Sequence, residues 1–313
     1  MKMQTAITAS VAGLITDIKV TAGQTIQEGQ LICKVVESSQ SSDVSDTQQP
    51  ISDSGENVLD QLNQQLASSL DSGRKKSVDK RHAKGYRTAR ENLRQLCDEG
   101  SFVEYGQLAV AAQRDRMSSE KLKAETAADG VITGLATINA DQFGEHATQV
   151  AVIVNDYTVL AGTQGYFHHR KIDRMLEQAK RGYLPVVMYT EGGGGRPGDT
   201  DVKIQIAGLD VPTFASWASL SGQVPMIAVN NGYCFAGNAA LFGCADIRIA
   251  TKSSWIGMAG PAMIEGGGLG NFAPTDIGPM DVQSKNGVVD LVADDEAHAT
   301  ALAQQCLSYF QGG

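Results

Sequence analysis

The chain has 313 residues, of which 42% are hydrophobic, and a formal net charge of −9, so it can form one large and one small domain but is a poor general binder of nucleic acid. No apolar run approaches the roughly 20 residues that cross a bilayer, and polar residues from the start disfavour a signal peptide, so we expect a cytoplasmic protein without membrane contact. The five cysteines form no CxxC pair, which predicts reduced thiols and no metal site.

Residues 4–37 have the pattern of short strands separated by glycine turns. The apolar residues between these turns are few, so we expect a small all-β unit with little core of its own. The turn dipeptides are Ala12-Gly13, Ala22-Gly23 and Glu28-Gly29, and the apolar residues between them are Leu14, Ile15, Ile18, Val20, Leu31, Ile32, Val35 and Val36.

Residues 38–55 change composition to Ser, Gln, Asp and Thr. Such a segment buries too little apolar surface to order itself, so we expect a flexible tether. A short amphipathic helix follows, because Val58, Leu59, Leu62, Leu66 and Leu70 recur at helical spacing. We therefore divide the chain into residues 1–37, a linker with a short helix over 38–73, and a main domain over 74–313.

A basic segment runs from Arg74 to Arg94, and Leu93 and Leu96 give it one apolar stripe. This pattern predicts a helix with one buried face. The simplest explanation of its cations is that they lie on a solvated helical face or at a subunit contact. The same cations could instead attract an anionic ligand, such as the phosphates of coenzyme A, or nucleic acid. The cations are Arg74, Lys75, Lys76, Lys80, Arg81, Lys84, Arg87, Arg90 and Arg94.

From Ala127 onward, strand patterns alternate with helix patterns. This alternation is typical of a layered α/β domain with crossover connections. The predicted strands cover residues 150–154, 157–160, 185–189, 225–229 and 247–250, and the predicted helices cover 172–179, 214–220 and 237–242.

A glycine-rich loop, residues 191–199, follows the strand that we expect over 185–189. The loop lacks the lysine and Ser/Thr of a P-loop, which disfavours that kind of phosphate binding. Four consecutive glycines, Gly192 to Gly195, let a ligand approach the backbone and its N–H groups closely. We expect a backbone cradle, because ligand sites of α/β folds lie at strand ends. The alternative is a mobile surface loop.

A helix made of small residues begins near Gly237, after the strand that we expect over 225–229. Unpaired N–H groups at a helix start stabilise negative charge. Small residues at Ala236 and Gly237 leave room for a carbonyl oxygen over the amides of Gly237 and Asn238. The pattern therefore predicts an oxyanion hole. The alternative is a tightly packed structural turn.

Met1-Lys2-Met3 and the glycine-spaced residues after it resemble the biotinyl domain of biotin-dependent carboxylases. The resemblance implies that Lys2 carries biotin through an amide, on an exposed hairpin. The alternative is that Lys2 is an ordinary residue near the start of the chain. The family places about as much sequence before this lysine as after it, so we expect a C-terminal half of a carrier domain, with poor presentation of Lys2 in this chain.

Residues 87–311 resemble the N-terminal half of the acyl-CoA carboxyltransferases, which belong to the crotonase superfamily. The resemblance implies a crotonase-like layered α/β domain, with Gly237 and Asn238 as the oxyanion hole. It also implies substrate contacts from two backbone segments and the residue before the hole, which are Gly162, Thr163, Gly165, Gly192, Gly193, Gly194, Gly195 and Ala236. The ordered matches that carry it are residues 88–93, 98–104, 128–134 and 157–171, the glycine loop, the Gly237 helix start and residues 260–266.

The resemblance implies the carboxyltransferase component of a biotin-dependent acyl-CoA carboxylase of the acetyl- or propionyl-CoA type. Biotin would be the cofactor, and the partners would be acyl-CoA, the biotin-binding carboxyltransferase half and a biotin carboxylase component, in an oligomer. We expect this chain to lack the biotin-binding half. In the family's mechanism the cofactor supplies the base, and the protein holds oxyanions with backbone donors.

Two other functions remain open. One is a non-catalytic fragment or subunit that binds CoA without turnover. The other is a crotonase-type hydratase or decarboxylase, for which Glu191 and Glu265 are the candidate acid–base groups. His168 and His169 are weaker catalytic candidates, because we expect them to begin a charged surface helix.

Overall fold

The computed structural model of the chain describes residues 13–21, 24, 26–27, 29–37, 58–199, 201 and 211–312. It divides into two compact units, residues 1–56 and residues 57–313. Lys2 lies outside the described residues. No helix in the described part of the chain is long and apolar enough to cross a membrane.

The first unit contains an antiparallel strand pair. Strand β1 (Gly13–Thr16) pairs with β2 (Lys34–Glu37), with Gly13 opposite Glu37 and Thr16 opposite Lys34. Leu14, Ile15 and Val36 remain exposed. The strand pair thus has little core of its own, as the sequence predicts.

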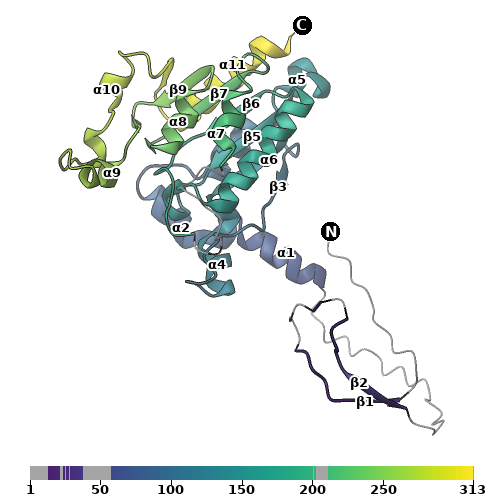
Figure 1. The fold of residues 1–313 in the computed structure, drawn as a ribbon. Coiled ribbons are helices and arrows are strands. Elements are labelled where there is room, and N and C mark those ends of the chain that lie inside the picture. The colour runs from purple at the N-terminus through teal and green to yellow at the C-terminus, as the bar shows by residue number, and fades with distance from the viewer. Residues whose placement is uncertain are drawn as a thin grey trace. The chain divides into compact units, whose positions relative to one another are not determined.

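The second unit is built on a seven-stranded sheet (Figure 1). Strands β5, β6, β7, β9 and β11 pair in parallel, and β4 and β3 add an antiparallel edge. A two-stranded parallel sheet, β8 with β10, lies apart from it. The strands in chain order are β3 (Val103–Tyr105), β4 (Val131–Thr137), β5 (Gln149–Asn155), β6 (Val186–Tyr189), β7 (Met226–Asn230), β8 (Tyr233–Phe235), β9 (Ile247–Thr251), β10 (Trp255–Gly257) and β11 (Leu291–Ala293).

Helices cover both faces of the large sheet (Figure 1). Side chains alternate between the faces along each strand: Ala151 and Ile153 pack with α6, α7 and α8, whereas Val150 and Val152 pack with α3 and α11. This is the layered α/β architecture that the sequence predicts. The helices are α1 (Val58–Ser68), α2 (Lys75–His82), α3 (Ala89–Leu96), α4 (Ser119–Glu125), α5 (Ala140–Phe143), α6 (Tyr166–Gly182), α7 (Thr213–Ala218), α8 (Gly237–Gly243), α9 (Pro261–Gly266), α10 (Met280–Gln283) and α11 (Glu296–Gln311), with 3-10 turns η1 (Asp71–Arg74), η2 (Ala127–Gly130), η3 (Glu145–Ala147), η4 (Leu160–Gly162) and η5 (Pro274–Asp276).

Two expectations about local structure are wrong. The basic segment is two helices, α2 and α3, because Thr88 and Glu91 form a capping box that starts a new helix. The strand expected over 157–160 is instead a turn that leads into η4. Leu160, Ala161 and Gly162 have φ of 47°, 54° and 61°, which no strand can contain.

Candidate functional site

Three backbone segments meet where the parallel strands β5, β6 and β7 end. Ligand sites of open α/β sheets lie at such carboxyl ends. The Gly193 N–H donates to Ala161 O at 3.1 Å, and the Gln164 N–H donates to Gly194 O at 2.8 Å. The Gly192 N–H donates to Tyr233 O at 2.7 Å. The glycine loop is therefore held between the turn after β5 and strand β8.

The Asn238 side chain joins these segments at their centre. It is fully buried. Its Oδ1 accepts from the Gly194 N–H at 2.9 Å, and its Nδ2 donates to Thr190 O at 3.1 Å and to Gly162 O at 3.4 Å. Asn238 thus cross-links the segments that follow β5 and β6 from the first turn of α8, which follows β8.

The backbone before α8 leaves amides free. Ala236 has φ 53° and ψ −119°, a sparsely populated conformation for a residue with a side chain. Its N–H donates to Gly257 O at 3.0 Å, and its carbonyl accepts the first helical hydrogen bond, from Ala240 N–H at 2.9 Å. Among the described residues, the amides of Gly237 and Asn238 find no partner. These are the amides that the sequence predicts to be an oxyanion hole.

The space beside the Gly237 Cα is not open. A Cβ added there would collide with Oε1 of Gln164, with the Phe214 ring close behind. A side chain at Gly237 would therefore require the Gln164 side chain to shift. The expectation that this small residue leaves room for a substrate oxygen over the amides of Gly237 and Asn238 stays a prediction.

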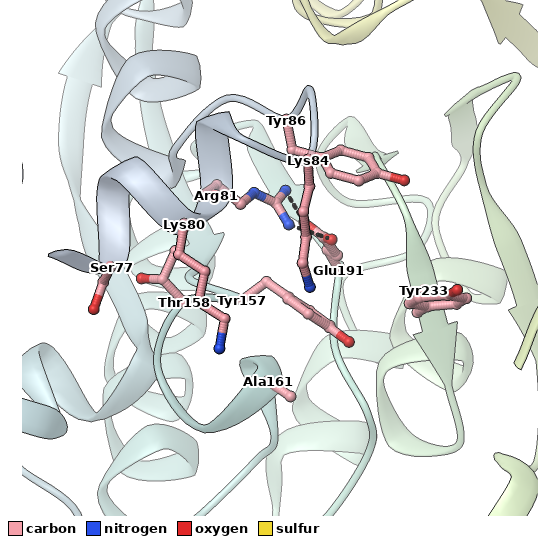
Figure 2. Close-up of a pocket in the computed structure, with 10 residues that line it drawn as sticks. All are labelled: Ser77, Lys80, Arg81, Lys84, Tyr86, Tyr157, Thr158, Ala161, Glu191 and Tyr233. Carbon is pink, nitrogen blue, oxygen red and sulfur yellow. Dashed lines mark hydrogen bonds and ion pairs between the residues drawn. The ribbon is translucent and has the colours of Figure 1, made fainter.

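A cavity of about 450 Å³ lies between α2 and the loops (Figure 2). Its wall combines cations of the basic segment with three tyrosines, so it offers positive charge beside aromatic faces. Figure 2 shows Arg81 pointing at Glu191, with Lys84 and Tyr157 beside the pair. The lining residues are Ser77, Lys80, Arg81, Lys84, Tyr86, Tyr157, Thr158, Ala161, Glu191 and Tyr233.

A second cavity, of about 760 Å³, lies beside the glycine loop and α9. Tyr157 and Tyr233 line both cavities, so the two adjoin at these rings. The wall of the second cavity is mostly apolar or backbone. Its lining residues are Tyr157, Gly193, Gly195, Arg196, Pro197, Tyr233, Phe235, Ala236, Gly260, Pro261, Ala262, Met263 and Pro274.

Glu191 is an ion-pair partner in this structure. Its Oε1 and Oε2 accept from Arg81 Nη1 at 2.9 Å and Nη2 at 2.6 Å, and both side chains are 8% exposed. Burial raises the pKa of the Glu191 carboxyl to about 7, and Arg81 opposes that shift. Because Arg81 engages both oxygens, Glu191 is poorly placed as a free acid or base.

The other acid–base candidates lie away from the two cavities. Glu265 is exposed on α9 and lines neither cavity. His168 is fully buried near the start of α6, contrary to the surface position expected, and its Nδ1 lies 3.0 Å from Asp129 O. Burial lowers the pKa of His168 well below its ordinary value, and that of His169 to about 4. Both rings are therefore neutral packing groups.

The predicted substrate-contact residues divide into two groups. Gly193, Gly195 and Ala236 line the second cavity. The other five residues line neither cavity; they are Gly162, Thr163, Gly165, Gly192 and Gly194. The amides of Gly192, Gly193 and Gly194 all donate within the protein, so the loop offers fewer free donors than expected.

Several cavity residues escape prediction from the sequence. Tyr86 and Tyr157 were not singled out, and Ala161 lines the first cavity in place of its neighbours Gly162 and Thr163. Lys80 and Lys84 were noted only as part of a basic segment. The sequence does contain one signal for Tyr157: this residue comes two positions after the apolar run that forms β5, and ligand sites of α/β folds lie at such strand ends.

Comparison with known proteins agrees with this geometry. Residues 80–312 match the family described as "Carboxyl transferase domain". The chain belongs to the carboxyl transferase family. Residues 1–35 match a second family, described as "Biotin-requiring enzyme". The family assignment made from the residues is confirmed, and with it the carboxyltransferase type of fold.

Relatives of the carboxyl transferase family match most of this chain. The methylmalonyl-CoA carboxyltransferase 12S subunit of Propionibacterium freudenreichii subsp. shermanii is 30% identical over 81% of this chain and 46% of its own length. The propionyl-CoA carboxylase beta chain of Roseobacter denitrificans is 28% identical over 80% of this chain and 47% of its own. The chain thus spans about half the length of these relatives.

Solved structures give the same assignment. A single-chain, multi-domain long-chain acyl-CoA carboxylase is 52% identical, with a TM-score of 0.79, over 100% of this chain and 29% of that one. The transcarboxylase 12S hexamer, solved with hydrolysed methylmalonyl-CoA bound, is 29% identical, with a TM-score of 0.66, over 80% of this chain and 46% of that one.

Proposed function

We propose that residues 74–313 bind acyl-CoA and form the acyl-CoA half of a biotin-dependent carboxyltransferase. One observation carries the proposal: a basic, tyrosine-lined cavity adjoins a largely apolar one at Tyr157 and Tyr233. Acyl-CoA has the matching chemistry, since its nucleotide is anionic and its acyl end is apolar. The named activities of the relatives support the same substrate class.

The first cavity is the proposed nucleotide end. Lys80 and Lys84 bring two ammonium groups to its wall, and phosphates bind such groups as point charges. The rings of Tyr86 and Tyr157 offer faces for a base to stack on. We therefore assign the lysines of the basic segment to binding an anionic ligand, and not to a solvated helical face.

The second cavity is the proposed acyl end, with the thioester beside Ala236. The free amide of Gly237, with that of Asn238, is the proposed donor to the thioester oxygen. That oxygen gains negative charge as the enolate forms, so a fixed donor stabilises the transition state more than the substrate. Phe235, Pro261 and Met263 supply an apolar wall for the acyl chain, which supports chains longer than acetyl.

Biotin is the proposed cofactor, attached at Lys2. The match of residues 1–35 to biotin-requiring enzymes supports this attachment. When bound and carboxylated, biotin supplies the carboxyl group and the base for the α-proton. Leu14 and Val36, which pair across the two strands, form an exposed apolar face that further strands of a carrier domain would cover.

The setting and partners complete the proposal. We infer a second carboxyltransferase half and a biotin carboxylase component as partners, in an oligomer, because the 12S relative is described as a hexamer. Cys33, Cys97, Cys234, Cys244 and Cys306 are free thiols, which supports a reducing, cytoplasmic setting.

Calorimetric titration of the chain with a series of acyl-CoAs tests the proposal. We expect binding, and a weaker affinity by at least about tenfold when Lys80 and Lys84 are both changed to Ala, because two phosphate contacts are lost. A Lys76→Gln variant is the matched control, since Lys76 lies on α2 outside the cavity wall. Absence of binding by the unaltered chain contradicts the proposal.

A further inference from the structure

Two buried arginines connect α2 to the ends of neighbouring strands. Arg74, just before the helix, donates from Nη1 to Asp156 Oδ2 at 2.6 Å. Arg81, near its end, holds Glu191 by two parallel hydrogen bonds. Asp156 directly follows β5, and Glu191 comes two residues after β6. The helix is therefore pinned where the two loops of the site begin.

These ion pairs dominate the attachment of α2. Within the helix, which is described in full, Arg81 is the one buried residue. Its guanidinium also lies 4.6 Å from the Tyr86 ring centroid and 5.6 Å from that of Tyr157, and its Nε donates to Arg87 O at 2.9 Å. A helix with so little apolar burial takes its position from Arg81.

The lysines in and just after the same helix repel one another, because Lys76 and Lys80 are four residues apart, as are Lys80 and Lys84. Like charges three and four residues apart destabilise a helix, and a bound anion relieves that repulsion. A phosphate group in the first cavity would therefore favour the helix in the position that the arginine pairs hold. The cations of the helix and its borders are Arg74, Lys75, Lys76, Lys80, Arg81 and Lys84, against one acid, Asp79.

The geometry points to Arg81 as a positioning residue that couples nucleotide binding to the shape of the glycine loop. The coupling rests on the proposed acyl-CoA function. Anion binding at Lys80 and Lys84 holds α2 in place, and α2 then holds Glu191 through Arg81. Glu191 is the first residue of the glycine loop and is joined directly to Gly192. Filling the nucleotide end thus orders the reacting end before the thioester arrives.

Hydrogen exchange of the loop amides tests the coupling. The Gly192, Gly193 and Gly194 amides are suitable reporters, because all three are hydrogen-bonded within the protein. The probe is 3′-phospho-ADP, the nucleotide part of CoA without the arm that reaches the loop. We expect it to slow exchange of these amides in the unaltered chain by about fivefold or more, the lower range of common allosteric couplings.

The decisive variant is the double change Arg81→Gln with Glu191→Gln. It breaks the pair without leaving a buried charge unpaired, a loss that endangers folding when only Arg81 is changed. We expect slowing of less than about twofold in this variant when the nucleotide is at saturating concentration, because the link between α2 and the loop is then broken. Lys76→Gln should keep the full slowing.

Equal slowing in the double variant overturns the coupling, as does nucleotide binding to the unaltered chain without any slowing. Failure of the nucleotide to bind also overturns it. The acyl-CoA titration then separates the two ideas: if acyl-CoA still binds, the coupling alone is wrong, and if acyl-CoA does not bind, the proposed function is wrong as well.

Discussion

Changing Asn238 to Ala should destabilise the protein through one identifiable contact. The Asn238 Oδ1 is the acceptor for the Gly194 N–H at 2.9 Å, and both residues are buried. An alanine leaves that N–H without a partner, which costs about 1–3 kcal/mol. The carbonyls of Thr190 and Gly162 lose a donor, and a small void remains. We therefore expect the free energy of unfolding to fall by roughly 2–4 kcal/mol.

Urea unfolding followed by circular dichroism measures this change. Asn271→Ala is the matched control, because Asn271 is exposed on a loop and such substitutions stay within about 0.5 kcal/mol. A loss below about 1 kcal/mol in Asn238→Ala would show that Asn238 does not hold the three segments together. In the same variant, exchange of the Gly194 amide should accelerate more than that of Gly192, whose acceptor is Tyr233 O.

Three further predictions concern other parts of the chain. Burial holds the pKa of His169 at about 4, whereas the unfolded chain binds that proton below about 6.5. Stability that is present above pH 6.5 should therefore be lost as the pH falls toward 4, by about 3 kcal/mol. His169→Gln should flatten the unfolding free energy over that pH range, the exposed His146→Gln should not, and identical curves for both variants contradict this reading. In a chain that carries a complete biotinyl domain, Lys2→Arg should abolish avidin binding, and a persistent signal refutes the attachment. Glu265→Gln should change acyl-CoA affinity by less than about twofold, since an exposed charge outside the cavity wall is screened by solvent and salt, and a large loss would return Glu265 to the site.

The sequence predicts the buried parts of the fold well. Strands β5, β6, β7 and β9 and helix α8 lie where apolar runs and small residues place them, within one or two residues. These elements are determined locally, by burial on both faces of a parallel sheet. The start of α3 was also readable, because Thr88 followed by Glu91 is a capping box, although the basic segment was interpreted as one helix.

The site was predictable only in part, since its details depend on distant contacts. The turn at Leu160 and Ala161 has β-prone residues before it, yet its left-handed backbone is held by the Gly193 N–H on another loop. The partner of Glu191 is Arg81, 110 positions earlier in the chain. No local pattern indicates such a pair, nor that Gln164 occupies the space beside Gly237.

The central claim is that the Gly237 amide donates to the thioester oxygen, and replacing that amide by an ester tests it most directly. Glycolic acid at position 237 removes the N–H, adds no side chain, and so avoids the collision with Gln164 that any other residue would cause. The same replacement at Gly222, in an exposed turn, is the control. In an assembly completed with the second carboxyltransferase half, a biotinylated carrier and a biotin carboxylase, we expect the ester at Gly237 to lower the carboxylation rate by about 10²–10³, with acyl-CoA affinity within about threefold. A rate equal to that of the Gly222 control would contradict the account.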